Sequence, residues 1–319
     1  MLYYLHNLNS YWPYDQLLFR RIKINSRGLK MKKHLLHFVT ALALIPSLAA
    51  FGDFLPENNL HLEDSFTAGG LTEKEFNEVI DIAEDEFKDI VRKTGGRLKI
   101  NRRWSDSTVN ASASQFFGTW TVNMYGGLAR RPEVTKDGFL MVVCHELGHH
   151  LGGYPYSSSW ASNEGQSDYY ATQACGRFLF KGDTRKNATY RNTVETYPKS
   201  LCDKTWNSKA DQNLCYRMME ASYSIASLLG SLGGTKVYYD KPDTNKVSRT
   251  NNSHPKGQCR MDTYMAGALC DAEFDLEVIP GKDLGSNRNR AKGEEEAEKY
   301  SCMNGEKGSR PQCWFKPLT

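Results

Sequence analysis

The chain has 319 residues, of which 39% are hydrophobic, so it is long enough to bury the core of one large domain or two small ones. Its formal net charge of +4 is concentrated at the start, because residues 1–49 carry seven basic residues and one acidic residue. The remainder is therefore close to neutral and has none of the basic excess typical of nucleic-acid-binding proteins, and we expect no nucleic-acid partner.

Residues 31–49 have the pattern of a secretory signal peptide. Two lysines precede the apolar run Leu35 to Ile45, and a proline and small residues follow it. The run is well short of the ~20 residues that cross a bilayer, so we expect no stable membrane span in the mature chain. Residues 1–30 are interpreted as an extension that comes from a start codon assigned too early, with translation beginning at Met31. If the chain does start at residue 1, the apolar run is instead an internal anchor. The pattern predicts an exported protein, periplasmic or secreted, in which residues 50–319 form a single domain.

The segment Phe51 to Gly70 has no periodic pattern and is expected to be irregular. A helix is predicted from Thr72 to Thr94, because Thr72 and Glu75 match a capping box and apolar residues then recur with the helical period. Three strands are predicted next from alternating and β-branched residues. They are Arg97 to Trp104, Val109 to Phe117 and Thr119 to Tyr125.

The following segment, Phe139 to Gly153, contains the motif H-E-x-x-H. In a helix, His145 and His149 lie one turn apart on the same face, so both imidazoles can bind one metal ion. Glu146 is offset by one residue and is placed to act as general base on a zinc-bound water. The other interpretation, a histidine pair on a solvated helix face, is disfavoured by the apolar run that begins the helix.

A second helix is predicted from Ser162 or Asn163 to about Phe180. Glu164 and Asp168 lie one turn apart on it. We expect Glu164 to be the third zinc ligand and Asp168 to accept the second N–H of a zinc-bound histidine. Alternatively, Glu164 is an ordinary first-turn acid that the helix dipole stabilises.

The motif H-E-L-G-H followed by N-E-x-x-S-D resembles the gluzincin type of zinc peptidase, nearest to the HtpX-like and CAAX-prenyl-protease-like metallopeptidases and their soluble periplasmic relatives. The resemblance covers Asn110 to Asp168 well. It implies an α+β, mainly helical zincin-like domain with a small antiparallel sheet, whose edge strand lies over the zinc helix. By this resemblance the edge strand is Thr119 to Tyr125, where an extended polypeptide substrate would bind by strand addition. A plain structural hairpin is the alternative.

The resemblance extends weakly to Ser253 to Met261, an H-P…R segment. It implies that His254 reaches the site as a hydrogen-bond donor or transient ligand, and that Arg260 orients the zinc-site acids or stabilises an oxyanion. In the alternative interpretation, His254 is a surface loop residue and Arg260 a structural ion-pair partner. The absence of predicted membrane spans and the short distance from His149 to Glu164 in the sequence depart from the membrane-bound members.

The remaining segments carry weaker signals. Lys181 to Asp211 is polar and expected to be a loop, Leu214 to Leu232 a core helix, and Gly281 to Glu298 a mobile charged segment. All eight cysteines follow the predicted signal, which indicates disulfides. Proximity in the sequence favours Cys202–Cys215, Cys259–Cys270 and Cys302–Cys313, the last pinning the tail. Cys144 and Cys175 either pair or remain buried thiols.

Three functions fit these patterns. The first is a zinc-dependent endopeptidase acting on exported or envelope polypeptides, with Zn²⁺ held by His145, His149 and Glu164. The second is a non-catalytic, zinc-stabilised polypeptide-binding or chaperone-like module. The third is a metallohydrolase that uses the same residues on a non-peptide amide.

Overall fold

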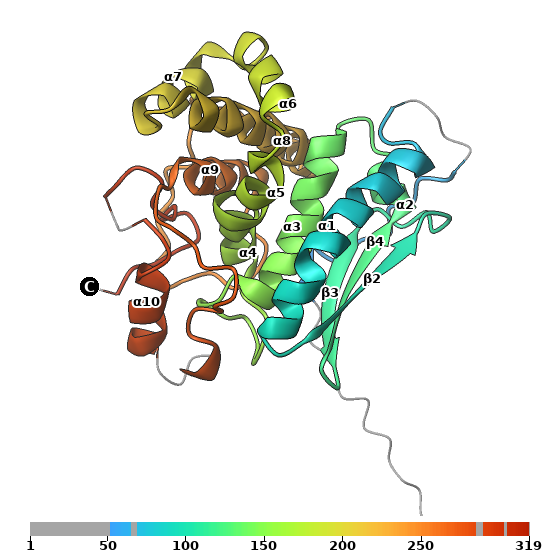
Figure 1. Cartoon of the computed structure of the whole chain (residues 1–319), viewed down its shortest axis with the longest axis horizontal. Coiled ribbons are helices and arrows are strands. Elements are labelled where there is room, and N and C mark those ends of the chain that lie inside the picture. Colours follow the sequence, from blue (N-terminus) through green and yellow to red (C-terminus); the bar gives the residue numbers. More distant parts are fainter. Residues whose placement is uncertain (1–51, 65–68, 285–289, 303–304, 319) are drawn as a thin grey trace, which may run out of the picture. The chain divides into compact units, whose positions relative to one another are not determined.

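In the computed structural model, a four-stranded sheet is covered on one face by helices α1 (Glu73–Lys93) and α3 (Lys136–Leu151), as Figure 1 shows. The structure describes residues 52–64, 69–284, 290–302 and 305–318, so the predicted extension and signal peptide lie outside the described residues. The described part is a mixed α+β fold. The helices that follow residue 163 gather on the side of α3 that faces away from the sheet (Figure 1).

The sheet contains β1 (Gly52–Asp53), β2 (Arg97–Arg103), β3 (Ala111–Phe116) and β4 (Thr119–Tyr125), in the order β1-β3-β4-β2. β3 pairs antiparallel with β1 and β4, whereas β2 pairs in parallel with β4. The prediction of a small antiparallel sheet is therefore correct for β1, β3 and β4 but wrong for β2, and the prediction that Thr119–Tyr125 is an edge strand is wrong. The alternation of apolar and polar residues along a strand shows which side chains face the helices. It does not show the strand order, which depends on the connection after β2 that places the β3–β4 hairpin between β1 and β2.

Helix α1 forms as predicted. The Thr72 hydroxyl accepts the backbone N–H of Glu75, and the Glu75 carboxylate accepts the Thr72 N–H, which completes the capping box. Its apolar face is buried against the sheet and α3. The buried residues are Phe76, Val79, Ile80, Ala83, Phe87 and Val91.

Helix α3 is buried along nearly its whole length. Thr135 caps its start, and the helix ends at Gly152, after which Gly153 takes a positive φ of 75°. An added Cβ at Gly148 would lie 2.9 Å from the backbone of Ser167, so this glycine lets the next helix approach closely.

The predicted helix after Asn163 is divided into α4 (Glu164–Tyr170), a π-helical segment (Ala171–Gly176) and α5 (Arg177–Lys181). The π turn inserts an extra residue per turn, which periodicity alone does not reveal. Its Cys175 bonds to Cys144 on α3, so a disulfide joins α3 to the continuous helical stretch that begins with α4.

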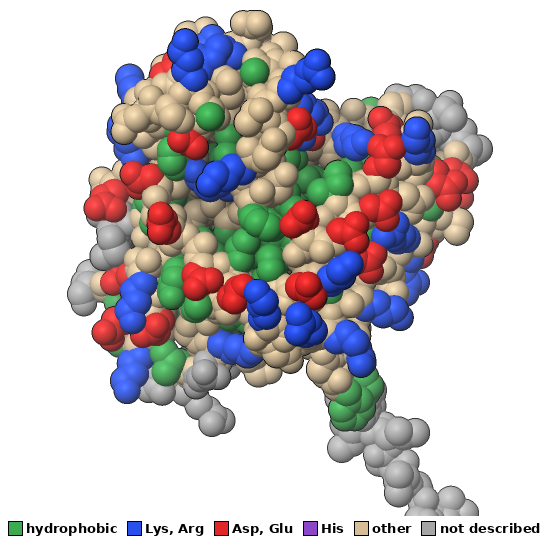
Figure 2. Space-filling model, viewed as in Figure 1, with side chains coloured by type: hydrophobic (Ala, Val, Ile, Leu, Met, Phe, Trp, Pro, Cys, Tyr) green, Lys and Arg blue, Asp and Glu red, His purple; other side chains and the backbone are tan. Residues whose placement is uncertain are grey.

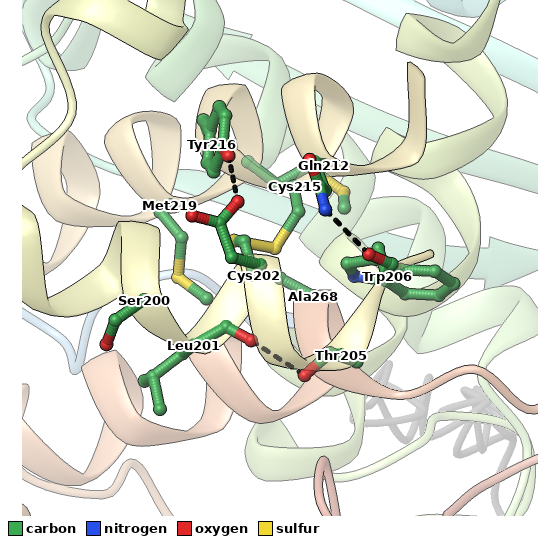
Figure 3. Close-up of a disulfide and its surroundings, with 12 residues drawn as sticks. Ser200, Leu201, Cys202, Thr205, Trp206, Gln212, Cys215, Tyr216, Met219 and Ala268 are labelled. Atoms are coloured by element: carbon green, nitrogen blue, oxygen red, sulfur yellow. Dashed lines mark hydrogen bonds between the residues drawn. A yellow bond between two sulfur atoms is a disulfide. The ribbon is translucent and has the colours of Figure 1, made fainter. Parts of the chain in front are cut away.

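The prediction of a loop over Lys181 to Asp211 is wrong, because this segment is mostly helical. It contains α6 (Thr184–Thr189), a 3-10 turn (Tyr190–Asn192) and α7 (Thr196–Thr205). α8 (Lys209–Leu232) also begins earlier than predicted, with Ser208 as its cap. The Cys202–Cys215 disulfide fastens α7 to α8, and beside it Gln212 donates a hydrogen bond to the Trp206 carbonyl at 2.9 Å (Figure 3). These polar helices depend on tertiary contacts, so their own sequences give little signal.

The C-terminal part contains α9 (Gly257–Leu269), a 3-10 turn (Lys282–Leu284) and α10 (Arg290–Glu298). The short helix α2 (Gly126–Ala129) lies earlier in the chain, directly after β4. α10 falls in the segment that was expected to be mobile, so that prediction is wrong for the helix, whereas residues 285–289 lie outside the described residues. A buried ion pair between Glu294 and Arg310, at 2.5 Å, helps hold α10 against the tail.

Four disulfides are present, and they correct two predicted pairings. Cys202–Cys215 is confirmed and Cys144 pairs with Cys175, but Cys259 bonds to Cys313 and Cys270 to Cys302. Cys259 and Cys270 lie near opposite ends of α9, and a helix rises ~1.5 Å per residue, which puts their Cα atoms too far apart for a disulfide. The C-terminal tail is held by its cysteines, as predicted, but its two disulfides join it to Cys259 on α9 and to Cys270 at the end of that helix.

A buried carboxylate, Asp137, ties α3 to α6 and α8. Arg217 donates to both of its oxygens at 2.7 and 2.9 Å, and Lys186 and Tyr190 donate at 2.8 and 2.6 Å. Burial alone would raise the pKa of Asp137, but these hydrogen bonds and the charge of Arg217 outweigh burial and lower the pKa from 3.8 to about 2.

We expect this network to make stability depend on pH. A depressed pKa stabilises the fold above the unfolded value, so a contribution of about 2 kcal/mol is lost as the pH falls from about 4 to about 2. Urea unfolding of the wild type and Asp137→Asn across this range measures the loss, which the variant should lack. Asp89→Asn is the control, since Asp89 pairs with Arg92 in solvent. Parallel stability curves for the wild type and Asp137→Asn would contradict the assignment.

On the face in Figure 2, acidic and basic side chains are interspersed, and apolar side chains are exposed in a central hollow and at the tip of the β3–β4 hairpin. At that tip Phe116 is 63% exposed and Phe117 90% exposed. Among the described residues, the helices are too short or too polar to cross a membrane.

Candidate metal centre

The two motif histidines on α3 present the same ring nitrogen to one point. His145 Nδ1 lies 2.7 Å from Asp168 Oδ1, and His149 Nδ1 lies 2.8 Å from the Ser162 carbonyl oxygen. Both partners accept hydrogen bonds, so each Nδ1 carries a proton, which leaves Nε2 as the ring nitrogen that can bind a metal ion. The arrangement fixes both rings and both tautomers in the form that binds a metal ion.

Glu164 opens α4 and brings a carboxylate to the same point. Asn163 caps this helix by accepting the N–H of Gln166 at 2.9 Å, and its own side-chain amide donates to the Asn251 carbonyl. Glu164 Oε2 lies 3.4 Å from His145 Nε2, and Oε1 lies 3.6 Å from His149 Nε2. Ligands about 2.0–2.1 Å from a tetrahedral zinc ion are separated by about 3.4 Å, so this spacing fits such an ion.

The donor atoms also lack other partners. His145 Nε2, His149 Nε2 and Glu164 Oε2 are buried without a hydrogen bond to any described residue. Both carboxylate oxygens of Glu146 share that condition. Buried polar atoms are nearly always satisfied, so the unpaired donors of His145, His149 and Glu164 indicate a site that could hold a metal ion.

The charges around the site alter its titration. Burial alone would lower the pKa of His145, but the charge of Asp168 and the hydrogen bond to it raise the pKa to about 9. Burial lowers the pKa of His149 to about 4. Burial would raise the pKa of Glu164, but the charge of His149 and contact with His145 hold it below its ordinary value. A metal ion must therefore displace a proton from His145, whereas the other two ligands are ready to bind.

Glu146 differs from the other carboxylates. Burial raises its pKa well above the ordinary value, and the nearby charges of Glu164 and Asp53 add to this effect, although His145 opposes it. A carboxylate with a raised pKa is a stronger base, which is the property that proton abstraction from water requires.

Arg260, on α9, binds Asp168, the carboxylate that orients His145. Its Nε and Nη2 donate to the two oxygens of Asp168 at 2.6 and 2.7 Å, and the pair is completely buried. Burial would raise the pKa of Asp168, but the charge of Arg260 lowers it far below 3.8. Asp168 thus remains ionised where it holds His145, and Arg260 acts on the site through this carboxylate.

His254 reaches the site from the loop before α9. Its Nε2 lies 2.7 Å from the Asp53 carbonyl oxygen and 3.4 Å from Glu164 Oε2. The carbonyl can only accept, so His254 donates from Nε2. The structure thus brings together the predicted site residues His145, His149, Glu164, Asp168, His254 and Arg260. Glu146 follows His145 on α3 and is close enough for the charges of His145 and Glu164 to alter its pKa.

Sequence reasoning missed what covers this site. The segment that was expected to be irregular contains β1, and Gly52 lies directly against the His149 ring. Burial raises the pKa of Asp53, and the charge of Glu164 raises it further. A two-residue strand has no recognisable pattern, so nothing in the sequence pointed to it.

The predicted place for a bound polypeptide is also corrected. β4 (Thr119–Tyr125) is hydrogen-bonded to β3 on one side and to β2 on the other, so it cannot accept another strand. The outer edge of β3 pairs with β1, whose Gly52 lies against the candidate ligand His149.

A second group, Asp243 with Cys259 and Cys313, has donors close together, but both sulfurs are bonded to each other. It is therefore no metal site. Comparison of the chain with protein-family models, curated proteins and solved structures finds no match. The functional argument consequently depends on the geometry of the His145–His149–Glu164 site.

Proposed function

We infer that the protein is a zinc-dependent endopeptidase of the gluzincin type, with a zincin-like fold similar to the HtpX-like and CAAX-prenyl-protease-like enzymes. The observation that carries this proposal is the convergence of His145 Nε2, His149 Nε2 and a Glu164 carboxylate at tetrahedral spacing, with the unpaired carboxylate of Glu146 on the same helix. Three protein ligands are the number found in catalytic rather than structural zinc sites.

A bound zinc ion supplies Lewis acidity, which polarises a scissile carbonyl and acidifies water. The residues of the chain do the rest. Glu146 takes the proton of the attacking water and passes it to the leaving amine. His254 donates from Nε2 toward a substrate carbonyl, as it now does toward Asp53. Asp168 and Arg260 hold His145 in place.

The test is metal-dependent cleavage by the purified protein. We expect one equivalent of zinc by elemental analysis, cleavage of casein or a peptide library, loss of cleavage with 1,10-phenanthroline and recovery on adding Zn²⁺. Ala substitution of His149 should abolish both zinc binding and cleavage. Stoichiometric zinc without any cleavage of peptides would contradict the proposal, and hydrolysis confined to non-peptide amides would favour the third function instead.

One observation favours a non-catalytic, zinc-stabilised binding module as the second candidate. His145 and Glu146 are 0% exposed and His149 is 1% exposed, so a substrate cannot reach them in this conformation. Such a module would bind zinc and polypeptides without turnover. Glu146 argues against it, because a buried carboxylate without a partner among the described residues serves no purpose in a purely structural site.

The proposed location follows from the disulfides. Four disulfides, all among the described residues, are typical of proteins in oxidising compartments. Together with the predicted signal peptide, they support export to the periplasm or the medium, where the substrates would be exported or envelope polypeptides.

A further inference from the structure

The metal-binding face is closed by the chain itself. β1 pairs with the outer edge of β3 in antiparallel register, Gly52 opposite Ala113 and Asp53 opposite Ser112. A Cβ added to Gly52 would lie 2.5 Å from His149 Cδ2 and 2.7 Å from Nε2, the nitrogen that faces Glu164. β1 therefore lies over the ligand atoms, and only a residue without a side chain fits there.

Contacts hold this segment from both sides, as they would hold an extended polypeptide. On the β3 side, the Phe54 N–H donates to the Ala111 carbonyl at 3.0 Å. On the other side, His254 donates to the Asp53 carbonyl at 2.7 Å and Arg260 Nη1 donates to the Phe54 carbonyl at 2.6 Å. These backbone contacts recognise a peptide chain of almost any sequence.

The two halves of the segment are anchored very differently. Phe54 is 0% exposed, with its ring edge-on to His145 and under the Arg260 guanidinium, and Leu55 is 3% exposed. β1, in contrast, is two residues long, and its register pairs join it to one strand only. Phe54 can therefore remain in the core while Gly52 and Asp53 move away from β3.

We propose that β1 occupies the polypeptide-binding site in place of a substrate, and that a substrate strand reaches Glu146 only when Gly52 and Asp53 leave β3. The proposal rests on the function inferred above. It makes the resting enzyme latent: the segment that covers the site is a built-in competitor of the substrate. An incoming polypeptide would run antiparallel to β3 and take over the hydrogen bond from His254.

Substitution of Gly52 tests the proposal, because a side chain at this position and an undisturbed His149 ring cannot both fit. Gly52→Ala and Gly52→Val should evict β1 and raise kcat/KM for peptides. A cover that is closed more than about nine-tenths of the time predicts an increase of at least about tenfold. Gly182→Val is the matched control, since an added Cβ there meets nothing within 4 Å, and it should leave activity unchanged.

Metal exchange supplies a readout that does not require hydrolysis. We expect the zinc of Gly52→Ala and Gly52→Val to pass to a chromogenic chelator faster than that of the wild type, and a peptide hydroxamate to bind both variants more tightly. Unchanged exchange, binding and cleavage would overturn the proposal. Loss of zinc from both variants would also overturn it, because the added side chain would then displace His149 and not β1. Failure of Gly52→Ala to fold would overturn it as well, because β1 would then be an essential part of the fold.

The two proposals fail in different ways. Faster exchange and tighter hydroxamate binding without cleavage by any form would support the cover and refute the peptidase. Equal, chelator-sensitive cleavage by the wild type and both variants would support the peptidase and refute the cover.

Discussion

Replacement of Glu146 by glutamine is expected to leave zinc binding intact and to lower peptide hydrolysis by about 10²- to 10⁴-fold, the range that a general base contributes. The glutamine amide has nearly the shape of the carboxylate but cannot accept a proton at neutral pH. Glu146 is not one of the three converging donors, so the ligand set of the variant is unchanged. The loss should fall on kcat, because proton abstraction belongs to the transition state and not to substrate binding.

The measurements are zinc stoichiometry, kcat and KM for one peptide, and the thermal midpoint of unfolding. Glu220→Gln is the matched control: Glu220 is half-buried on α8, its pKa is also raised by burial, and Tyr239 donates to it. That change should not alter hydrolysis. Full activity in Glu146→Gln would remove the proposed mechanism, even with zinc bound, whereas loss of zinc would make Glu146 a ligand and not a base.

The Glu146 substitution should also stabilise the apo fold slightly. A buried carboxylate without a hydrogen bond to any described residue carries a desolvation penalty, which the raised pKa of Glu146 reflects. A neutral amide reduces this penalty. A higher unfolding midpoint together with lost hydrolysis would show that the site is strained for catalysis.

Which candidate ligands share a helix face was predictable, because this depends on the geometry of each helix alone. His145 and His149 share a face whatever the rest of the chain does, and an N-cap at Asn163 starts the helix that carries Glu164 and Asp168. That these two helices meet was not a local property. It depends on the missing side chain of Gly148 and on the contacts that Asn163 makes with the Asn251–Asn252 loop.

The errors share one cause, which is that the decisive contacts join distant segments. β4 lies in the interior of the sheet because β2 pairs with its second edge. The residues of β4 themselves do not distinguish an edge strand from an interior strand. The Cys259–Cys313 bond spans 54 residues, so proximity in the sequence misled the pairing. The closure of the site depends on Gly52, in a segment without periodicity, so the sequence could not indicate that the metal face is covered.

Replacement of Arg260 by methionine is expected to be the most destabilising single change near the site. It leaves the Asp168 carboxylate, at 0% exposure, without its cationic partner. Breaking one side of a buried ion pair typically destabilises a protein by about 3–5 kcal/mol. Part of that loss is electrostatic and part comes from the hydrogen bond to the Phe54 carbonyl, so the two contributions must be separated.

Neutralising Asp168 in the same background separates them. Arg260→Met with Asp168→Asn should recover part of the lost stability, because the unpaired charge is gone, but zinc affinity should stay 10- to 100-fold reduced, roughly the effect of losing a partner that orients a histidine ligand. Arg177→Met is the control. Its side chain is half-buried and donates to the backbone carbonyls of Gln173, Ala268 and Cys270. Its removal therefore leaves no buried carboxylate unpaired and should destabilise the protein less. Equal destabilisation by both arginine substitutions, with no recovery in the double variant, would mean that Arg260 only fills space, and the orienting role of the Asp168–Arg260 pair would have to be abandoned.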